Sequence, residues 1–396
     1  MPLPNTFRAT TRTDIMRQTN TSRGFTLLEM MVSMALGLLV LGGASLLYKQ
    51  SVDTTWMTSQ KSEMQQDFRA VSNLLERDIG MAGSGSLGQQ GLGSSSVALP
   101  VSGTSAVYPC SATTCNYVNG APVAYPSQSG ANYLYSVIPG NNLGITVNGQ
   151  TTDILTVTYT DANLALNCYT VTYNSATSIT FTLPTVLPST CILPQGLVVP
   201  QALNNTVVGL QTGDIILFST SGAGAAAVGV VTGTPTTGTN GSGQTFYTVP
   251  FALGDPGRIN QPAVSVGSLK ALAGQTITAA VRLLVITYYL DISPSDGVTP
   301  RLMRVQSGRP PAPVAENVMY LKFSYDVYNG GAVSANQNSL PVNTTPGMIT
   351  KVNITHMTMR SQLKGVKGYQ GLDLQTSITP RNLTFQQEYP ISGSAY

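Results

Sequence analysis

Glu29 is the residue of this chain whose position most needs a chemical reason. It is the only charged side chain between Phe25 and Tyr48, a stretch made otherwise of apolar and small residues with one Thr and two Ser. A carboxylate at the centre of a membrane-spanning helix costs ~2.5–3.5 kcal/mol, and less near a helix end. A charge in such a segment usually serves a function and has a partner. Glu29 is therefore a candidate functional carboxylate whose partner has to be found.

The four cysteines are the second group that could do chemistry. Cys110, Cys115, Cys168 and Cys191 all lie after the apolar segment, and an even number in an exported chain is typical of two disulfides. Of the three connectivities, we favour the local one, Cys110–Cys115 and Cys168–Cys191. The cysteine spacings do not fit a zinc site, and the single histidine, His356, is distant in sequence.

Catalysis by this chain is poorly supported. His356 lies in an alternating run typical of a strand, where a structural role is the simpler interpretation. No Ser-His-Asp order, metal-ligand cluster or glycine-rich phosphate loop is present in the sequence. We therefore expect neither an enzyme nor a cofactor or metal site.

Charge is scarce, at 9% of all residues, against ~25% in ordinary proteins. The chain has 20 Lys and Arg against 17 Asp and Glu. Residues 1–24 hold four of the arginines and one aspartate, so residues 25–396 carry 16 of each sign and are neutral by count. A neutral chain is not expected to bind nucleic acid, which requires a basic surface.

The apolar run from Phe25 to Tyr48 is long enough to cross a bilayer once, because about 20 helical residues span the ~30 Å hydrocarbon core. A secretory signal peptide usually has an apolar region of only ~7–15 residues. An ordinary single-span anchor would leave Glu29 and the Gly24–Phe25 junction unexplained. Since the arginines gather in residues 1–24, we expect that end in the cytoplasm and the bulk of the chain outside. Met16 is an alternative start that would shorten this leader.

A single long helix is predicted from about Phe25 to Ile79, because no proline lies between Pro4 and Pro100. After Tyr48 the pattern becomes amphipathic, which indicates a helix packed on a core. The apolar positions of this stripe are Val52, Trp56, Met64, Phe68, Val71, Leu75 and Ile79. Gly37, Gly42 and Gly43 allow two interpretations: a place where the helix loosens on assembly, or small residues for close helix packing.

A Gly- and Ser-rich segment at 80–93 ends the predicted helix. After it, short alternating runs predict strands separated by turns. The predicted strands are 153–159, 168–173, 178–183, 214–219, 245–251, 281–290, 318–328 and 351–360, with a hairpin across 174–177 and a tight turn at Asn329-Gly330. Between Arg77 and Arg258 there is no Lys or Arg, and the tract 219–243, full of Gly, Ala, Thr and Asn, includes loop.

The run Arg23-Gly24-Phe25-Thr26-Leu27-Leu28-Glu29, continued by the apolar segment, resembles the processing site of type IV pilins and type II secretion pseudopilins. The resemblance implies that a dedicated peptidase cuts between Gly24 and Phe25 and N-methylates Phe25. It also implies that Glu29, fifth in the cut chain, pairs with a Phe25 amine during assembly, either its own or a neighbour's.

Looser matches resemble the PilW family of minor pilins. They are 74–83 (LLERDIGMAG), 153–157 (DILTV), 213–216 (GDII), Tyr288, 301–304 (RLMR), 316–318 (ENV) and 379–383 (TPRNL). The long stretch that is poor in charge departs from the family pattern.

The expected fold is α+β and pilin-like: a long N-terminal helix packed on an antiparallel β-sheet head that carries a long β-rich insertion. The expected parts are a leader (1–24), a membrane and assembly helix (25–48), its amphipathic continuation (49–80) and a head (81–396), within which 95–260 form the insertion.

The resemblance implies a minor pilin of a type IV pilus. Its partners would be the prepilin peptidase, other minor pilins, the major pilin and an inner-membrane assembly platform. It would begin in the bacterial inner membrane and end in the fibre or at its tip. Three alternatives stay open: a J-type pseudopilin of type II secretion, a tip adhesin that binds through the insertion, and a minor pilin for DNA uptake.

Overall fold

The computed structural model describes residues 24–85, 96–101, 103–128, 130–221, 226–261, 266–361 and 368–380. The leader arginines, Met16 and the last residues of the 379–383 match lie outside this part of the chain. The chain divides into two compact units, 1–57 and 58–396, and helix α1 (Leu27–Met81) contributes residues to both.

Helix α1 begins and ends close to the predicted limits. Thr26 caps its first turn, because its hydroxyl oxygen accepts a hydrogen bond from the Glu29 N–H at 3.2 Å. The helix runs without a break through the three glycines of its apolar half and ends at Met81. Gly83 follows with a φ of +74°, the left-handed conformation that favours glycine after a helix. The loosening at Gly37–Gly43 concerns assembly and stays a prediction.

The buried stripe of α1 lies in the second unit. Val71, Leu75 and Ile79 are fully buried and Met64 nearly so, with Phe68 packed beside them. Val52 and Trp56, which belong to the first unit, are exposed. The amphipathic pattern therefore predicts the buried face correctly from Met64 onward.

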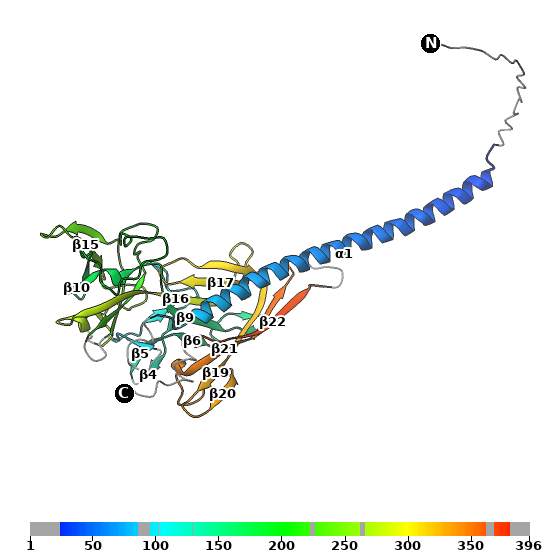
Figure 1. Cartoon of the computed structure of the whole chain (residues 1–396). Helices are drawn as coiled ribbons and strands as arrows, with labels where there is room; N and C mark the ends of the chain where they lie inside the picture. Colours follow the sequence, from blue (N-terminus) through cyan, green and yellow to red (C-terminus); the bar gives the residue numbers. More distant parts are fainter. Residues whose placement is uncertain are drawn as a thin grey trace, which may run out of the picture. The chain divides into compact units, whose positions relative to one another are not determined.

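A seven-stranded antiparallel sheet is the centre of the second unit (Figure 1). Its hub is β16 (Ile277–Ile292), which pairs with β12 through its first half and with β9 and β17 through its second. The other strands are β6 (Val137–Gly140), β9 (Ile154–Thr160), β12 (Ile215–Thr220), β13 (Ala226–Val230), β17 (Pro300–Gln306) and β18 (Ala312–Glu316).

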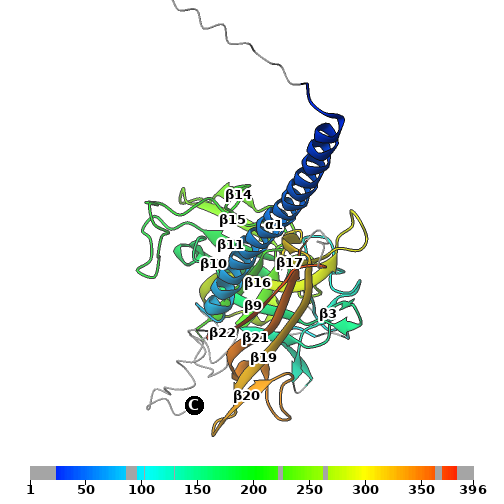
Figure 2. The ribbon, with the colours of Figure 1, turned by 90° about the vertical axis from the view of Figure 1, so that its right-hand side faces the viewer.

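Two four-stranded antiparallel sheets accompany it (Figure 2). One has the order β10-β11-β15-β14, formed by β10 (Thr170–Ser175), β11 (Ser178–Thr182), β14 (Thr236–Thr239) and β15 (Thr245–Pro250). The other has the order β20-β19-β21-β22, formed by β19 (Val318–Tyr328), β20 (Val333–Gln337), β21 (Ile349–Arg360) and β22 (Gly371–Ile378).

Short elements complete the described fold. A three-stranded sheet contains β1 (Ser96–Leu99), β5 (Ala131–Tyr135) and β4 (Ser127–Gln128), and two ladders pair β2 (Val107–Tyr108) with β3 (Val123–Ala124) and β7 (Thr146–Val147) with β8 (Gln150–Thr151). Three 3₁₀ turns occur: η1 (Leu166–Cys168), η2 (Leu269–Leu272) and η3 (Pro346–Met348).

Three apolar clusters hold the second unit together, and β16 contributes to each. Tyr288 belongs to the cluster that receives α1 and strands β9, β19 and β21. The next residue, Tyr289, belongs to the cluster that includes residues of β1 and β5, because successive strand residues point to opposite faces. Ala280 belongs to the third cluster, with β10, β11 and β15.

The α+β pilin-like fold class is confirmed. Every predicted strand is present within a few residues of its predicted ends, including the 174–177 hairpin, where β10 pairs with β11. The short strands β1–β8 and also β17, β18, β20 and β22 were not predicted from the sequence. The tract 219–243 contains strands β13 and β14, which were not predicted, as well as loop. The residue limits proposed for the leader, the membrane helix and the insertion stay predictions.

Candidate functional site

Gly24, Phe25 and Thr26 form a short non-helical segment immediately before α1, and Phe25 is 80% exposed. A peptidase needs an accessible backbone outside regular secondary structure, and this exposed, non-helical segment is compatible with cleavage between Gly24 and Phe25. Glu29 lies in the first turn of α1 and is exposed. A carboxylate there interacts favourably with the positive end of the helix dipole.

A second site surrounds Asp78, whose side chain is fully buried where α1 packs on the central sheet. The Tyr288 hydroxyl donates a hydrogen bond to it at 2.7 Å and the Tyr159 hydroxyl donates another at 3.0 Å. The Arg304 guanidinium donates through Nε at 2.8 Å, and the more exposed Arg77 adds a contact at 3.2 Å. Strands β9, β16 and β17 thus each hold the same carboxylate.

The Asp78 site is electrostatically satisfied. Burial raises the pKa of Asp78, but the hydrogen bonds from Tyr288 and Arg304 and the charge of Arg304 outweigh burial, so the pKa lies below its usual value. Burial and the neighbouring carboxylate raise the pKa of Tyr159 to about 12. Asp78 therefore remains an anion and its tyrosine partners remain donors at neutral pH.

The sequence contains a signal for this site, although the site was not predicted. Asp78 lies three residues after Leu75 on the buried stripe of α1, so an ionisable group on an apolar face predicts a buried partner. The 74–83, Tyr288 and 301–304 matches were noted only as resemblances, and the structure brings Asp78, Tyr288 and Arg304 together.

Two further buried carboxylates join distant parts of the chain. Asp153 accepts from Lys322 Nζ at 2.7 Å and from the Phe323 N–H at 3.0 Å, which ties the start of β9 to β19. Asp214 pairs with Arg282 at 3.1 Å and with Arg309 at 3.2 Å.

A third such carboxylate, Asp161, pairs with Arg282 through the Arg282 Nε at 2.9 Å. For Asp153, Asp161 and Asp214 alike, the cationic partner comes from beyond residue 258. These pairs attach the low-charge part of the chain to the part that follows it.

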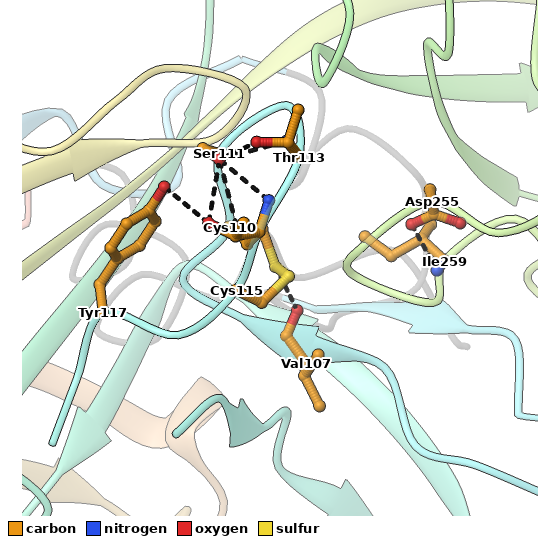
Figure 3. The surroundings of a disulfide bond; sticks show 9 residues. Val107, Cys110, Ser111, Thr113, Cys115, Tyr117, Asp255 and Ile259 are labelled. Carbon is orange, nitrogen blue, oxygen red and sulfur yellow. Dashed lines mark hydrogen bonds between the residues drawn. A yellow bond between two sulfur atoms is a disulfide. The ribbon is translucent and has the colours of Figure 1, made fainter. Parts of the chain in front are cut away.

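The disulfide between Cys110 and Cys115 closes a small loop (Figure 3). The Ser111 hydroxyl oxygen accepts from the backbone N–H groups of Thr113 and Thr114 at 3.2 and 3.1 Å, which stabilises the turn. This loop and Asp255 both line a small pocket of the second unit.

Asp255 is buried, and its carboxylate accepts the N–H groups of Ile259 and Asn260 at 3.0 and 2.8 Å. Burial raises the pKa of Asp255, although these N–H donors act in the opposite direction. Both oxygens of Asp255 are occupied by its own loop, so the carboxylate organises the loop and is not directed at a ligand.

The second disulfide joins Cys168, at the end of η1, to Cys191 in the long connection after β11. Both bonds are the local pairs that the sequence favours. Among the described residues, no group of three or more His, Cys, Asp or Glu side chains could hold a metal ion. His356 contacts Asp373 at 3.1 Å on the exposed face of β21 and β22.

Comparison with known proteins finds one match. A family model described as the prokaryotic N-terminal methylation motif matches residues 19–45, which include Gly24, Phe25 and Glu29. No curated protein and no solved structure matches the chain. Helix α1 is long and apolar enough to cross a membrane, and none of its most apolar stretch is buried.

Together the motif and the helix-plus-sheet fold support a protein of the type IV pilin or pseudopilin class. They point to a structural protein that a prepilin peptidase processes, that is anchored in the inner membrane and that assembles with other pilins.

Proposed function

We propose that this protein is a minor pilin that helps to initiate assembly of a type IV pilus and is incorporated into the fibre. The observation that carries the proposal is the methylation motif at residues 19–45, which continues through one helix into a β-sheet unit. The leader is removed between Gly24 and Phe25, and the new Phe25 amine becomes N-methylated.

The charge of Glu29 has a clear use in such an assembly. A new ammonium at Phe25 lies at the positive end of the helix dipole, where a cation is disfavoured. In an apolar surrounding an unpaired ion is also costly. The Glu29 carboxylate offsets both costs, and pairing with a neighbouring subunit's amine fixes the axial position of one helix against the next.

The Asp78 site supports this role because it fixes the helix to the sheets. Tyr159, Tyr288 and Arg304 hold one buried carboxylate of α1 from three different strands. The part of α1 that belongs to the second unit is therefore fastened to strands β9, β16 and β17 of that unit.

The direct test replaces Glu29 with Ala and follows two readouts. Leader removal is measured by the mass of the chain, and incorporation is measured by immunoblotting sheared fibres. We expect normal cleavage and at least a tenfold loss from the fibre fraction. Glu63→Ala, which removes an exposed carboxylate further along α1, is the matched control and should be incorporated normally. Normal incorporation of Glu29→Ala would contradict the pairing.

A second experiment separates pilus assembly from type II secretion. Surface pili are quantified in a strain lacking the gene, and again in a background that cannot retract pili. Loss in the first strain with recovery in the second supports a priming minor pilin. Normal pili in both, with a defect in protein secretion, would instead assign the chain to the J-type pseudopilins.

A further inference from the structure

An amine, a carboxamide and a carboxylate meet at one point of the second unit. Nζ of Lys322 donates to Oδ1 of Asp153 at 2.7 Å and also contacts Oδ1 of the Asn142 side chain. The backbone N–H of Asn142 donates to the same Asp153 oxygen at 2.8 Å. Lys322 follows these partners by 180 and 169 residues, so only the fold brings the three groups together.

Backbone contacts hold each of the three groups in place. Asn142 lies in the turn after β6 with a φ of +56°, and Lys322 lies in β19 between the buried Leu321 and Phe323. Asp153 immediately precedes β9, and its N–H donates to the Leu321 carbonyl at 3.0 Å. Its second carboxylate oxygen accepts the Phe323 N–H, also at 3.0 Å. The amine and the carboxamide are thus positioned on either side of one fixed carboxylate.

A simple ion pair explains only part of this arrangement. The pair of Lys351 and Asp326, in the same sheet as Lys322, is wider at 3.7 Å and more exposed, with side chains 39% and 14% accessible. The side chains of Lys322 and Asp153 are 19% and 1% accessible. An ion pair also gives no reason for the Asn142 carbonyl to meet the amine. The carbonyl carbon is one C=O bond, ~1.2 Å, from the oxygen that Nζ contacts.

These are the requirements of acyl transfer to an amine. A lysine amine becomes a nucleophile when a neighbouring base takes its proton, and the base must lie within hydrogen-bond distance. A fixed geometry with the reacting atoms about 3–3.5 Å apart replaces a slow bimolecular encounter. Asp153 meets the first requirement, and the contact between Nζ and the Asn142 carbonyl meets the second.

From this geometry we propose that the chain modifies itself, forming an amide bond between Nζ of Lys322 and Cγ of Asn142. Asp153 takes one proton from the Lys322 ammonium, and the free electron pair of Nζ adds to Cγ. Asp153 then gives that proton to Nδ2, the Cγ–Nδ2 bond breaks, and ammonia leaves. Nζ passes a second proton through Asp153 to the ammonia. The products are one amide and one ammonium ion, and nothing is oxidised or reduced.

The burial of the site favours this reaction over hydrolysis. Asp153 and most of the Lys322 side chain are shielded from the water that would compete for the carbonyl carbon. Asn142 is exposed, which gives the ammonia a route to solvent. Because the ammonia is lost to a large volume, the reverse reaction is suppressed.

The bond has a structural consequence that goes beyond the proposed function. Strand β6, which precedes Asn142, pairs within the central sheet, while Lys322 belongs to the four-stranded sheet that contains β19. An amide between them joins the two sheets covalently inside one subunit. Its formation requires no neighbouring subunit and therefore no pairing through Glu29.

The test measures the mass of the full chain, purified in detergent from the producing cells. We expect the mass to lie one ammonia, about 17 Da, below the value calculated with leader removal, methylation and both disulfides. Trypsin has no site between Arg77 and Arg258, so the position of the bond is mapped with chymotrypsin. The digest should contain a branched peptide in which Lys322 is joined to Asn142.

Two variants remove one reacting group each with little change in the fold. Lys322→Arg keeps a cation opposite Asp153, but a guanidinium stays protonated and does not attack. Asn142→Gly removes the carboxamide, and glycine accepts the φ of +56°. Both variants should have the mass calculated from their sequences and no branched peptide. Lys351→Arg, in the more exposed pair, is the matched control and should keep the mass deficit.

A third variant tests the proton transfer. Asp153→Asn keeps the shape of the side chain and one acceptor oxygen but cannot take the Lys322 proton. We expect the bonded fraction to fall at least tenfold. Intact disulfides and unchanged protease resistance show that this variant is folded. An undiminished bonded fraction would remove Asp153 from the reaction.

Three outcomes would overturn the bond itself. One is a wild-type chain with the unmodified mass. Another is a deficit that survives Lys322→Arg, since Asn142 can also lose ammonia by closing on its own backbone. The last is a bond that is absent from the Glu29→Ala strain, because the reaction occurs within one subunit. Fibre incorporation is scored separately: an unmodified wild type that enters the fibre contradicts the bond alone, and a bonded Glu29→Ala chain that enters it contradicts only the proposed pairing.

Discussion

Residues 79–257, called here the low-charge region, and the residues that follow them belong to one compact unit, yet the two parts use charge in different ways. In residues 258–361, Arg258, Lys270, Asp296 and Glu316 are exposed to solvent. In the low-charge region every aspartate is buried. Both parts build antiparallel sheets on apolar clusters, so the difference is not one of fold. It shows that carboxylates in the low-charge region serve as internal connectors, while its surface presents uncharged groups alone.

The largest effect that could break this comparison is expected at Asp78, because its loss removes the anion paired with Arg304, a cation of the second part. Asp78→Asn leaves the Arg304 guanidinium, whose side chain is 20% exposed, without its anion. Breaking a buried pair costs about 3–5 kcal/mol. We expect that loss in the unfolding free energy of the full chain in detergent, measured with urea.

The control for Asp78 is Asp291→Asn, which removes the partner of Arg301 in a more exposed pair. This variant should lower the free energy of unfolding by less than about 1 kcal/mol. Equal losses in the two variants would show that the Asp78 site does not fix α1 to the sheets.

The disulfides provide the next effect, because both lie in the low-charge region. In the chain-entropy model, the Cys168–Cys191 bond, with a sequence separation of 23, contributes about 3 kcal/mol. The Cys110–Cys115 bond, with a separation of 5, contributes about 2 kcal/mol. Replacing each pair by Ser and comparing urea midpoints should reproduce this order. If removal of the Cys110–Cys115 bond lowers the free energy of unfolding more than removal of Cys168–Cys191, the Cys110 loop stabilises the fold through contacts beyond its own closure entropy.

A smaller loss of stability is expected at Gly213 and Gly308, where the low-charge region contacts the residues that follow it. A Cβ on Gly213, which has a φ of +90°, would lie 2.3 Å from the Cα of Gly308. We expect Gly213→Ala to cost about 2 kcal/mol or more, because strain and overlap add. Gly149→Ala is the matched control, since Gly149 has a φ of +79° but nothing near its Cβ. If the two variants lose equal stability, the contact with Gly308 contributes nothing.

The smallest effect is confined to acid pH. The pKa of Asp78 is lower in the folded chain than in the unfolded chain, so its contribution is complete above the unfolded pKa of about 3.9. That contribution is lost as the pH falls through the folded pKa. The wild type should therefore lose stability below about pH 4 more steeply than Asp78→Asn, as measured by urea midpoints from pH 7 to pH 3. Parallel curves would contradict the lowered pKa.

The long elements were predictable because their patterns are strong and local. The absence of proline and the stripe of Val71, Leu75 and Ile79 sufficed for α1, and alternation over eleven residues sufficed for β19. Strand β17 was missed because Arg301 and Arg304 interrupt its apolar positions, and those arginines are explained only by partners far away in sequence. The partners of Asp78 were unpredictable for the same reason, since Tyr159 and Arg304 reach it only through the tertiary fold.

The position of β16 in the chain has a consequence for export. Strand β16 begins at Ile277, after residues 79–257, yet it contributes to all three apolar clusters. If the chain emerges from its N-terminus onward, strands β9 and β12 emerge before β16, the strand with which both pair. Both disulfides join cysteines that have already emerged by then. Oxidation of the cysteines can therefore close both local loops before β16 has emerged.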